Sequence, residues 1–279
     1  MLKTVLLSLL ALVVVAAAIV AWSYWRFAAA IDDDVRRLAA AASRETVIVT
    51  EEMLAGLPPV VQGHLRQSGV VGRAIPTIVR LRQTGRIRSS VEASWMSLEA
   101  EEVYSTDPPA FVWRASFPSA GLPLVTGRDE YRQGEGSILM KMLALFPVAD
   151  ESGGELVAAG LMRYLNEIMW FPQAYLGGNI SWRGIDDTSA EVTIADRGMT
   201  ASAILFFDGE GRLTNFRAQR HNTATRQVET WETPITGYGE LDGLQLPIRG
   251  EGVWKQAGGD FAYIEVEVTA LAFDEAALP

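Results

Sequence analysis

An apolar run near the N-terminus constrains this chain more than any other feature. The residues from Thr4 to Trp22 include only two polar side chains, Thr4 and Ser8. As a helix, this run would be roughly 28 Å long, close to the ~30 Å thickness of a bilayer's hydrocarbon core. Aromatic residues and Arg26 follow at the position where an interfacial belt would lie. The sequence therefore predicts a transmembrane helix that begins at Thr4 and ends at Trp22.

The same run also fits a cleavable signal peptide with a small-residue site at Ala28-Ala29-Ala30. The apolar run exceeds the usual 7–15 residues of a signal peptide, and Arg26 precedes the alanines. We therefore favour a retained signal-anchor.

The orientation of this anchor is read from its flanking charges. Arg26, Arg36 and Arg37 outnumber Lys3 and the amino terminus, so the positive-inside rule alone would leave the domain in the cytoplasm. The very short N-terminal tail, laid out like a signal sequence, favours the opposite side. We expect a single-pass protein of the cell membrane with its domain on the outer side, periplasmic or extracellular.

Composition excludes several classes of function. The formal charge of −10 argues against nucleic acid as a partner, because phosphate binding needs clustered positive charge. The chain has no cysteine, which excludes disulfides, thiolate metal sites and cysteine nucleophiles. We expect no cofactor and no metal.

Beyond the anchor, two short helices are expected before the sheet. Alanine-rich sequence continues the helical character as a stalk over residues 28–56. Thr50 followed by two glutamates has the pattern of a helix start, and Val60–Ser68 reads as a helix closed by Gly69.

From Thr77 onward the hydrophobic period is two, which is typical of strands with one buried face. One helix interrupts them at Glu155–Trp170, and its apolar face has helical spacing. Arg163 and Glu167 are expected to pair on the opposite, solvent-facing side. The apolar face consists of Leu161, Tyr164, Leu165, Ile168 and Met169.

The order of elements predicts a mostly β fold of the α+β class. Consecutive strands joined by hairpin turns, such as 208–211 and 257–260, imply antiparallel pairing. We predict an anchor over residues 1–27, a stalk over 28–56 and a single domain over 57–279. In this domain a curved antiparallel sheet, a half-barrel, wraps one long central helix at about 154–170.

No catalytic signature rises above chance. The two histidines, His64 and His221, have no spacing that supports a metal or hydrolase site. Gly134 and Gly136 precede a strand where a dinucleotide fingerprint requires a helix, so we interpret them as a turn. The acid pairs Glu101-Glu102 and Asp186-Asp187 could supply two carboxylates for hydrolysis. Adjacent acids on a strand point to opposite faces, however, so neither pair is placed as a catalytic dyad. We expect a protein that is not an enzyme.

Six arginines and no acid lie between Arg66 and Arg88. A basic face of this kind suits anionic lipid headgroups. We favour the plainer interpretation, a solvated strand face whose arginines pair with acids elsewhere.

Tryptophan and methionine are frequent in the soluble part. The plainer interpretation is that they build the core. The sharper one is that they line a cavity for a lipid or other apolar ligand, because such side chains adapt to irregular surfaces. The candidate ligand-binding residues are Trp170, Trp182, Tyr164, Met169 and Trp113.

Three stretches resemble a bacterial family of membrane-anchored proteins, a domain family of unknown function. They are Phe111–Ala115, Arg163–Pro172 and Asn179–Arg183, of which the arginine-tyrosine-leucine, acid, tryptophan, proline pattern is the most specific. The resemblance covers most of the chain from about Leu57 and implies no catalytic residue. More distantly, a sheet curved over a helix is similar to the lipoprotein-localisation-factor fold of envelope carriers.

Our leading hypothesis is a membrane-tethered envelope protein that binds a lipid or acyl chain in a β half-barrel. Its partners are then the lipid bilayer and the apolar ligand, and protein partners are unknown. The alternative is a structural or protein-interaction module of the envelope. A carboxylate-based hydrolase is a distant third.

Overall fold

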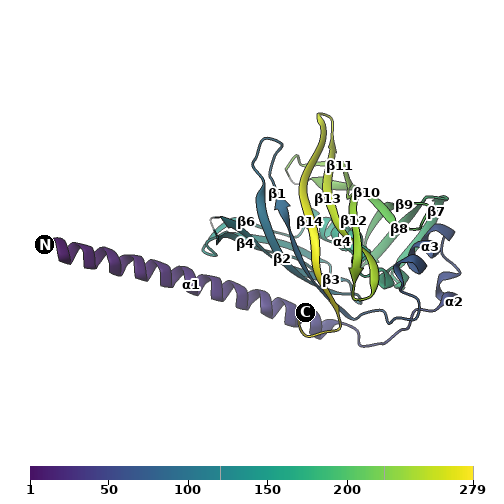
Figure 1. Cartoon of the computed structure of the whole chain (residues 1–279), viewed down its shortest axis with the longest axis horizontal. Coiled ribbons are helices and arrows are strands. Elements are labelled where there is room, and N and C mark those ends of the chain that lie inside the picture. Colours follow the sequence, from purple (N-terminus) through teal and green to yellow (C-terminus); the bar gives the residue numbers. More distant parts are fainter. Residues whose placement is uncertain (120, 223, 279) are drawn as a thin grey trace.

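The computed structural model describes residues 1–119, 121–222 and 224–278. Within these residues, fourteen antiparallel strands form one curved sheet, and a long helix leads into it from the N-terminus (Figure 1). The helical elements are α1 (Leu2–Ala41), α2 (Glu51–Leu54), α3 (Pro59–Ser68), α4 (Glu155–Glu167) and the 3₁₀ turns η1 (Ile168–Trp170) and η2 (Pro172–Leu176).

The strands divide into six before α4 and eight after it, among the described residues. The first group is β1 (Ile78–Ile87), β2 (Met96–Ser105), β3 (Ala110–Ser119), β4 (Leu122–Arg132), β5 (Glu135–Met142) and β6 (Phe146–Ser152). The second is β7 (Ile180–Asp186), β8 (Ser189–Asp196), β9 (Met199–Phe207), β10 (Leu213–Asn222), β11 (Gln227–Glu232), β12 (Ile235–Leu241), β13 (Leu244–Gln256) and β14 (Gly259–Phe273).

The first and last strands pair with each other in the middle of the sheet. β1 pairs with β14 from Val79↔Phe273 to Ile87↔Ile264, so the two hairpin-linked groups join in the middle of one sheet. The free edges are then β6 and β7, and β12 pairs with β13 off the main path. The chain must cross the concave side from one edge to the other, and α4 makes this crossing. The predicted mostly β half-barrel around a central helix is confirmed.

Local sequence explains the ends of the helices. Pro59 occupies the first turn of α3, where a missing N–H does no harm, and Gly69 closes it at φ 82°. The predicted helices at 51 and 60–68 are confirmed. The central helix is α from Glu155 to Glu167 and continues as a 3₁₀ turn to Trp170, after which Pro172 prevents further α-helix.

Helix α1 has two parts with different surroundings. Its N-terminal part is long and apolar enough to cross a membrane, with a mean hydropathy of 2.9 over 18 residues, none of them buried. Its C-terminal part packs on the convex face of the sheet, where Phe27, Ile31 and Leu38 meet Val103 and Val112. Helix ends at Ala41, and residues 44–47 have no regular structure. The segment expected to be a stalk therefore lies against the domain.

Candidate functional site

A cavity of about 800 Å³ lies between α4 and the concave face of the sheet. Its walls come from both halves of the sheet, because β1, β3, β4 and β5 contribute on one side and β10 to β14 on the other. Most of the exposed wall is apolar. The hydrophobic lining includes Ile138, Met140, Leu156, Trp231, Trp254 and Val266.

Alternation along the strands places these side chains in the cavity. On β5, Ile138 and Met140 are two residues apart and face the cavity, while Leu139 between them packs under α1. Gly127 lies opposite Met140 in the register, and a Cβ there would be 2.0 Å from the Met140 sulfur. Glycine at this position therefore makes room for the methionine.

Aromatic rings form the wall contributed by β11, β13 and β14. The rings of Trp231 and Trp254 have centroids 6.4 Å apart, and Tyr263 follows Trp254 at 6.1 Å. The Arg220 guanidinium lies 4.5 Å from the Trp231 ring centroid, a cation–π contact that keeps a positive charge beside the apolar wall.

A buried ion cluster forms the part of the wall where α4 meets β2 and β4. The register places Glu102, Trp113 and Asp129 side by side on the concave face of β2, β3 and β4. Arg163 of α4 reaches this row. Its guanidinium is 2.9 Å from a Glu102 oxygen, 2.6 Å from an Asp129 oxygen and 2.8 Å from a Glu167 oxygen.

Burial sets the electrostatics of this cluster. Burial raises the pKa of Glu102 well above its ordinary value, although the Arg163 charge opposes the rise, and Glu167 adds to it. Burial likewise raises the pKa of Glu167, against Arg163 and a hydrogen bond from the Tyr104 hydroxyl. For Arg163, burial would lower the pKa, but the carboxylates outweigh this effect and hold it well above its ordinary value.

The cluster corrects the prediction that Arg163 lies on a solvent-facing side of the central helix. The Arg163 side chain is 15% exposed, and its guanidinium also lies 4.9 Å from the Trp113 ring centroid. The i,i+4 pair with Glu167 exists, but it is buried. The reason is that a half-barrel surrounds its helix, so the polar face is enclosed as well as the apolar one.

The five predicted ligand-binding residues divide into two groups. Trp113, Met169 and Trp170 line the cavity. Trp182 is not among the lining residues and packs edge-on against Tyr175, with its Nε1 3.3 Å from the Tyr175 carbonyl oxygen. Tyr164 is also outside the lining and is buried, donating a hydrogen bond to the Ser105 carbonyl at 3.1 Å.

Several lining residues, among them Trp231, Trp254 and Arg220, are not among the five candidates. Trp231 and Trp254 alternate in their strands like any core residue, and only the β11–β13 pairing brings them together. Arg220 belongs to a strand with ordinary polar alternation. Tryptophan on an inward-facing strand position is the one signal that points to this wall.

The two histidines occupy different environments. His64 is fully buried, and burial lowers its pKa to about 4, so it is neutral, with its Nδ1 3.0 Å from the Gly211 carbonyl oxygen. His221 lines the cavity, and its Nε2 lies 2.5 Å from a Glu155 oxygen.

Most of the arginines between 66 and 88 have acidic partners. Arg66 pairs with Glu51, and Arg73 pairs with Asp242 at 3.7 Å. Arg82 and Arg86 pair with Glu101 and Glu265 across neighbouring strands. This agrees with the interpretation of a solvated face.

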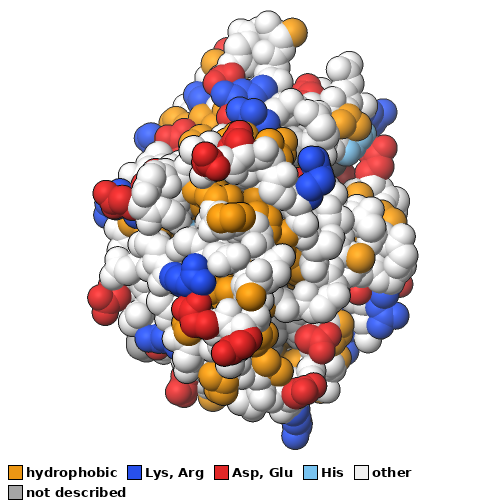
Figure 2. Space-filling view, turned by 90° about the vertical axis from the view of Figure 1, so that its right-hand side faces the viewer, with side chains coloured by type: hydrophobic (Ala, Val, Ile, Leu, Met, Phe, Trp, Pro, Cys, Tyr) orange, Lys and Arg blue, Asp and Glu red, His pale blue; other side chains and the backbone are white. Residues whose placement is uncertain are grey.

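The surface of the molecule turned away from the free end of α1 shows hydrophobic side chains gathered along its middle, with charged side chains around them (Figure 2).

A family model for a family of unknown function, DUF6544, matches residues 47–266. The chain belongs to this family. Its membership confirms the predicted resemblance to a domain family of unknown function. No curated protein sequence matches the chain.

Three solved structures that align with this chain share little sequence with it. A LolA superfamily protein from Nitrosomonas europaea is 8% identical with a TM-score of 0.45, and the alignment covers 78% of this chain and 93% of that one. A DUF1329 family protein from Desulfovibrio piger is 11% identical with a TM-score of 0.39 and the same coverage. Mycobacterium tuberculosis lipoprotein LppX is 13% identical with a TM-score of 0.20, over 61% of this chain and 88% of that one.

Proposed function

We propose that this chain is a membrane-anchored envelope protein that binds a lipid or acyl chain in the cavity between α4 and the sheet. The observation that carries the proposal is the cavity itself. Its volume of about 800 Å³ falls within the roughly 300–1,000 Å³ of small-molecule sites. Met140 and Met169 add flexible, polarizable side chains to its walls, which suit a ligand of variable shape.

The proposed anchor is the N-terminal part of α1. Its apolar side chains are exposed in the structure, with Leu7 and Leu12 each at 66%. Exposure of a continuous run of this kind in water is unfavourable, because apolar surface is stabilised by removal from water. A bilayer removes it from water. The anchor then keeps the cavity beside a source of lipid.

A substitution that fills the cavity tests whether the ligand binds there. Val266 lines the cavity on β14, and Thr269 on the same strand is exposed. The full chain, held in an amphipol to avoid detergent competition, is titrated with a fatty acid that carries an environment-sensitive fluorophore. We expect Val266→Trp to weaken uptake at least tenfold, about 1.4 kcal/mol, while Thr269→Trp binds like the wild type.

Each variant adds one tryptophan, so Thr269→Trp controls for the new side chain. Circular dichroism of both variants checks that the β signal persists. Equal uptake by the wild type and the folded Val266→Trp variant would contradict binding in this cavity. Absence of uptake by the wild type would leave a structural or interaction module as the better account.

A further inference from the structure

The ends of the β3–β4 and β5–β6 hairpins carry exposed hydrophobic side chains. Leu122 is 69% exposed, Phe146 63% and Val148 54%. Leu124 and Met142 are also exposed. Exposed apolar groups that gather on one part of a soluble surface usually mark an interaction site. These five residues, here called the tip patch, are therefore a candidate interaction site.

The tip patch lies beside the point where the proposed span ends. The Ser23 hydroxyl donates a hydrogen bond to the Leu143 carbonyl at 3.0 Å, at the β5–β6 turn. The Tyr24 hydroxyl donates to the Pro123 carbonyl, between Leu122 and Leu124. Strands β4 and β6 begin at these hairpin tips, which lie beside the middle of α1 (Figure 1). The apolar run of α1 ends at Trp22, the residue before Ser23.

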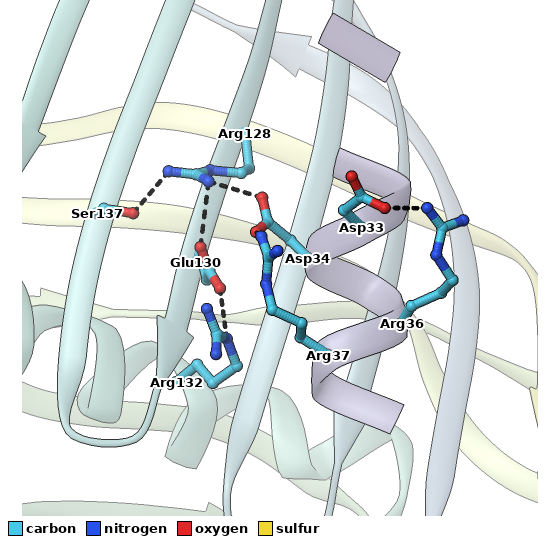
Figure 3. Close-up of polar contacts among 8 residues, drawn as sticks. All are labelled: Asp33, Asp34, Arg36, Arg37, Arg128, Glu130, Arg132 and Ser137. Atoms are coloured by element: carbon cyan, nitrogen blue, oxygen red, sulfur yellow. Dashed lines mark hydrogen bonds and ion pairs between the residues drawn. The ribbon is translucent and has the colours of Figure 1, made fainter. Parts of the chain in front are cut away.

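The helix is held firmly against this part of the sheet, so the position of the tip patch relative to the span is fixed. Asp34 of α1 is 4% exposed and lies 2.7 Å from an Arg128 nitrogen on β4, and it also pairs with Arg37 (Figure 3). Arg128 is in turn 3.3 Å from Glu130, which pairs with Arg132 at 2.7 Å. Buried charges in such a network require their partners, which opposes rotation of the helix.

Basic residues lie near the tip patch, as is typical of residues at a bilayer surface. Lys141 lies 5.1 Å from the Phe27 ring centroid, and Arg26 lies 4.9 Å from the Trp22 ring centroid. Aromatic and basic residues at the end of an apolar helix are typical of the headgroup level. Leu122, Leu124 and Phe146 are then at the depth where apolar side chains enter the acyl boundary.

We propose that the tip patch inserts into the lipid interface beside α1, so that the domain contacts the bilayer at two places. The proposal rests on the membrane anchoring proposed above. It also deepens the function, because the patch continues into the cavity. On β5, Met142 follows the cavity residue Met140 on the same face, and it pairs with Phe146 of β6. An apolar track therefore leads from the bilayer contact to the ligand site.

Single cysteines test this contact cleanly, because the chain has no cysteine of its own. Leu122→Cys and Phe146→Cys report the tip patch. Val14→Cys reports the span, and Val228→Cys, 65% exposed on the β10–β11 hairpin, is the matched control. Each full-length variant is labelled with an environment-sensitive fluorophore and reconstituted in phosphatidylcholine–phosphatidylglycerol vesicles with or without nitroxide-labelled lipid.

We expect strong nitroxide quenching at residues 14, 122 and 146, and at least fivefold weaker quenching at 228. Quenching at 14 alone would overturn the tip-patch contact and leave the anchor standing. Absence of quenching at 14 would overturn both. A blue-shifted fluorophore at 122 and 146 without lipid quenching would assign the patch to a second copy or another protein, which also overturns the proposal.

Transfer of a fatty acid from vesicles to the protein tests the apolar track separately. Phe146→Asp is expected to slow transfer of the fluorescent fatty acid from vesicles to the full-length protein at least tenfold. The same variant should bind the probe with unchanged affinity in amphipol, because Phe146 is not a cavity residue. Unchanged transfer would overturn the track, and weakened affinity in amphipol would show that Phe146 acts on the cavity instead.

Discussion

Replacement of Arg163 by methionine tests how the half-barrel holds its buried charges. Methionine keeps most of the length of the arginine side chain and removes its charge. Three carboxylates then lose their cation, and one of them, Glu102, has no exposed surface. Removal of one partner from a buried ion pair costs about 3–5 kcal/mol, because the other charge stays buried. We expect a loss in the free energy of unfolding within that range at pH 7.

The matched control is Arg183→Met. Arg183 also pairs with a glutamate, Glu191 at 2.9 Å, but its side chain is 67% exposed. Exposed pairs contribute up to about 1 kcal/mol, so this variant should lose less than that. Urea titrations of both full-length variants in detergent micelles, followed by tryptophan fluorescence, measure the two losses.

The loss in Arg163→Met should depend on pH. Folding raises the pKa of Glu102 and of Glu167 above 4.5, so the folded state holds extra protons at pH values above 4.5. Stability from these groups is therefore fully present below pH 4.5 and declines as pH rises through their folded pKa values. The variant lacks the charge that limits the rise, so its folded state binds still more protons. Its deficit relative to the wild type should shrink from pH 7 to pH 4.5.

Two results would refute this reasoning. Equal losses from Arg163→Met and Arg183→Met would mean that Arg163 is effectively solvated. A deficit that stays constant between pH 7 and pH 4.5 would mean that the carboxylates do not titrate as buried groups.

Three further expectations follow from the fold. Leu165→Ala should lower the free energy of unfolding by about 2–5 kcal/mol in a urea titration, because Leu165 is fully buried; a loss under 1 kcal/mol would contradict its place in the core. Gly136→Ala should lower the melting temperature, because a Cβ there would be 2.4 Å from the Leu156 carbonyl oxygen, whereas Gly178→Ala, with open space around it, should not. An alkaline phosphatase fused to the C-terminus should be active and a fluorescent protein there dark; the reverse would place the domain in the cytoplasm.

The sequence predicts the helices and strands, but it does not predict which distant strands pair. Alternation along β14, where Ile264, Val266 and Val268 separate charged residues, predicts a strand with one buried face. It does not reveal that β14 pairs with β1, whose partner residues lie 177 to 194 positions away in the chain. A hairpin turn indicates that two consecutive strands pair. No local pattern indicates that β1 and β14 pair, because the two strands are far apart in the sequence.

The same limit explains the candidate site. The helical spacing of Leu161 and Leu165 identified the buried face of α4, but Arg163 meets Asp129 and Glu102 from strands 34 and 61 residues away. No local pattern indicates those partners. Of the predicted ligand-binding residues, Met169 and Trp170 line the cavity because the central helix ends where it crosses the concave face, and Trp113 lines it from β3.

The contact between α1 and the sheet was also beyond the sequence pattern. Phe27, Ile31, Asp34 and Leu38 form a stripe at helical spacing, and all four are buried. Alanines around them and three consecutive aspartates gave this segment the composition of an exposed helix. Asp34 is buried beside Arg128 of β4 and also pairs with Arg37, so its charge is neutralised.

Photo-cross-linking tests the central claim, a lipid or acyl chain in the cavity, most directly. The full-length protein in vesicles that contain a fatty acid with a diazirine near its methyl end is irradiated, and the labelled peptides are identified by mass spectrometry. We expect label on cavity residues of α4, β13 and β14, and competition by unlabelled fatty acid. Label confined to α1 and the hairpin tips, with none on the cavity walls, would contradict ligand binding in the half-barrel.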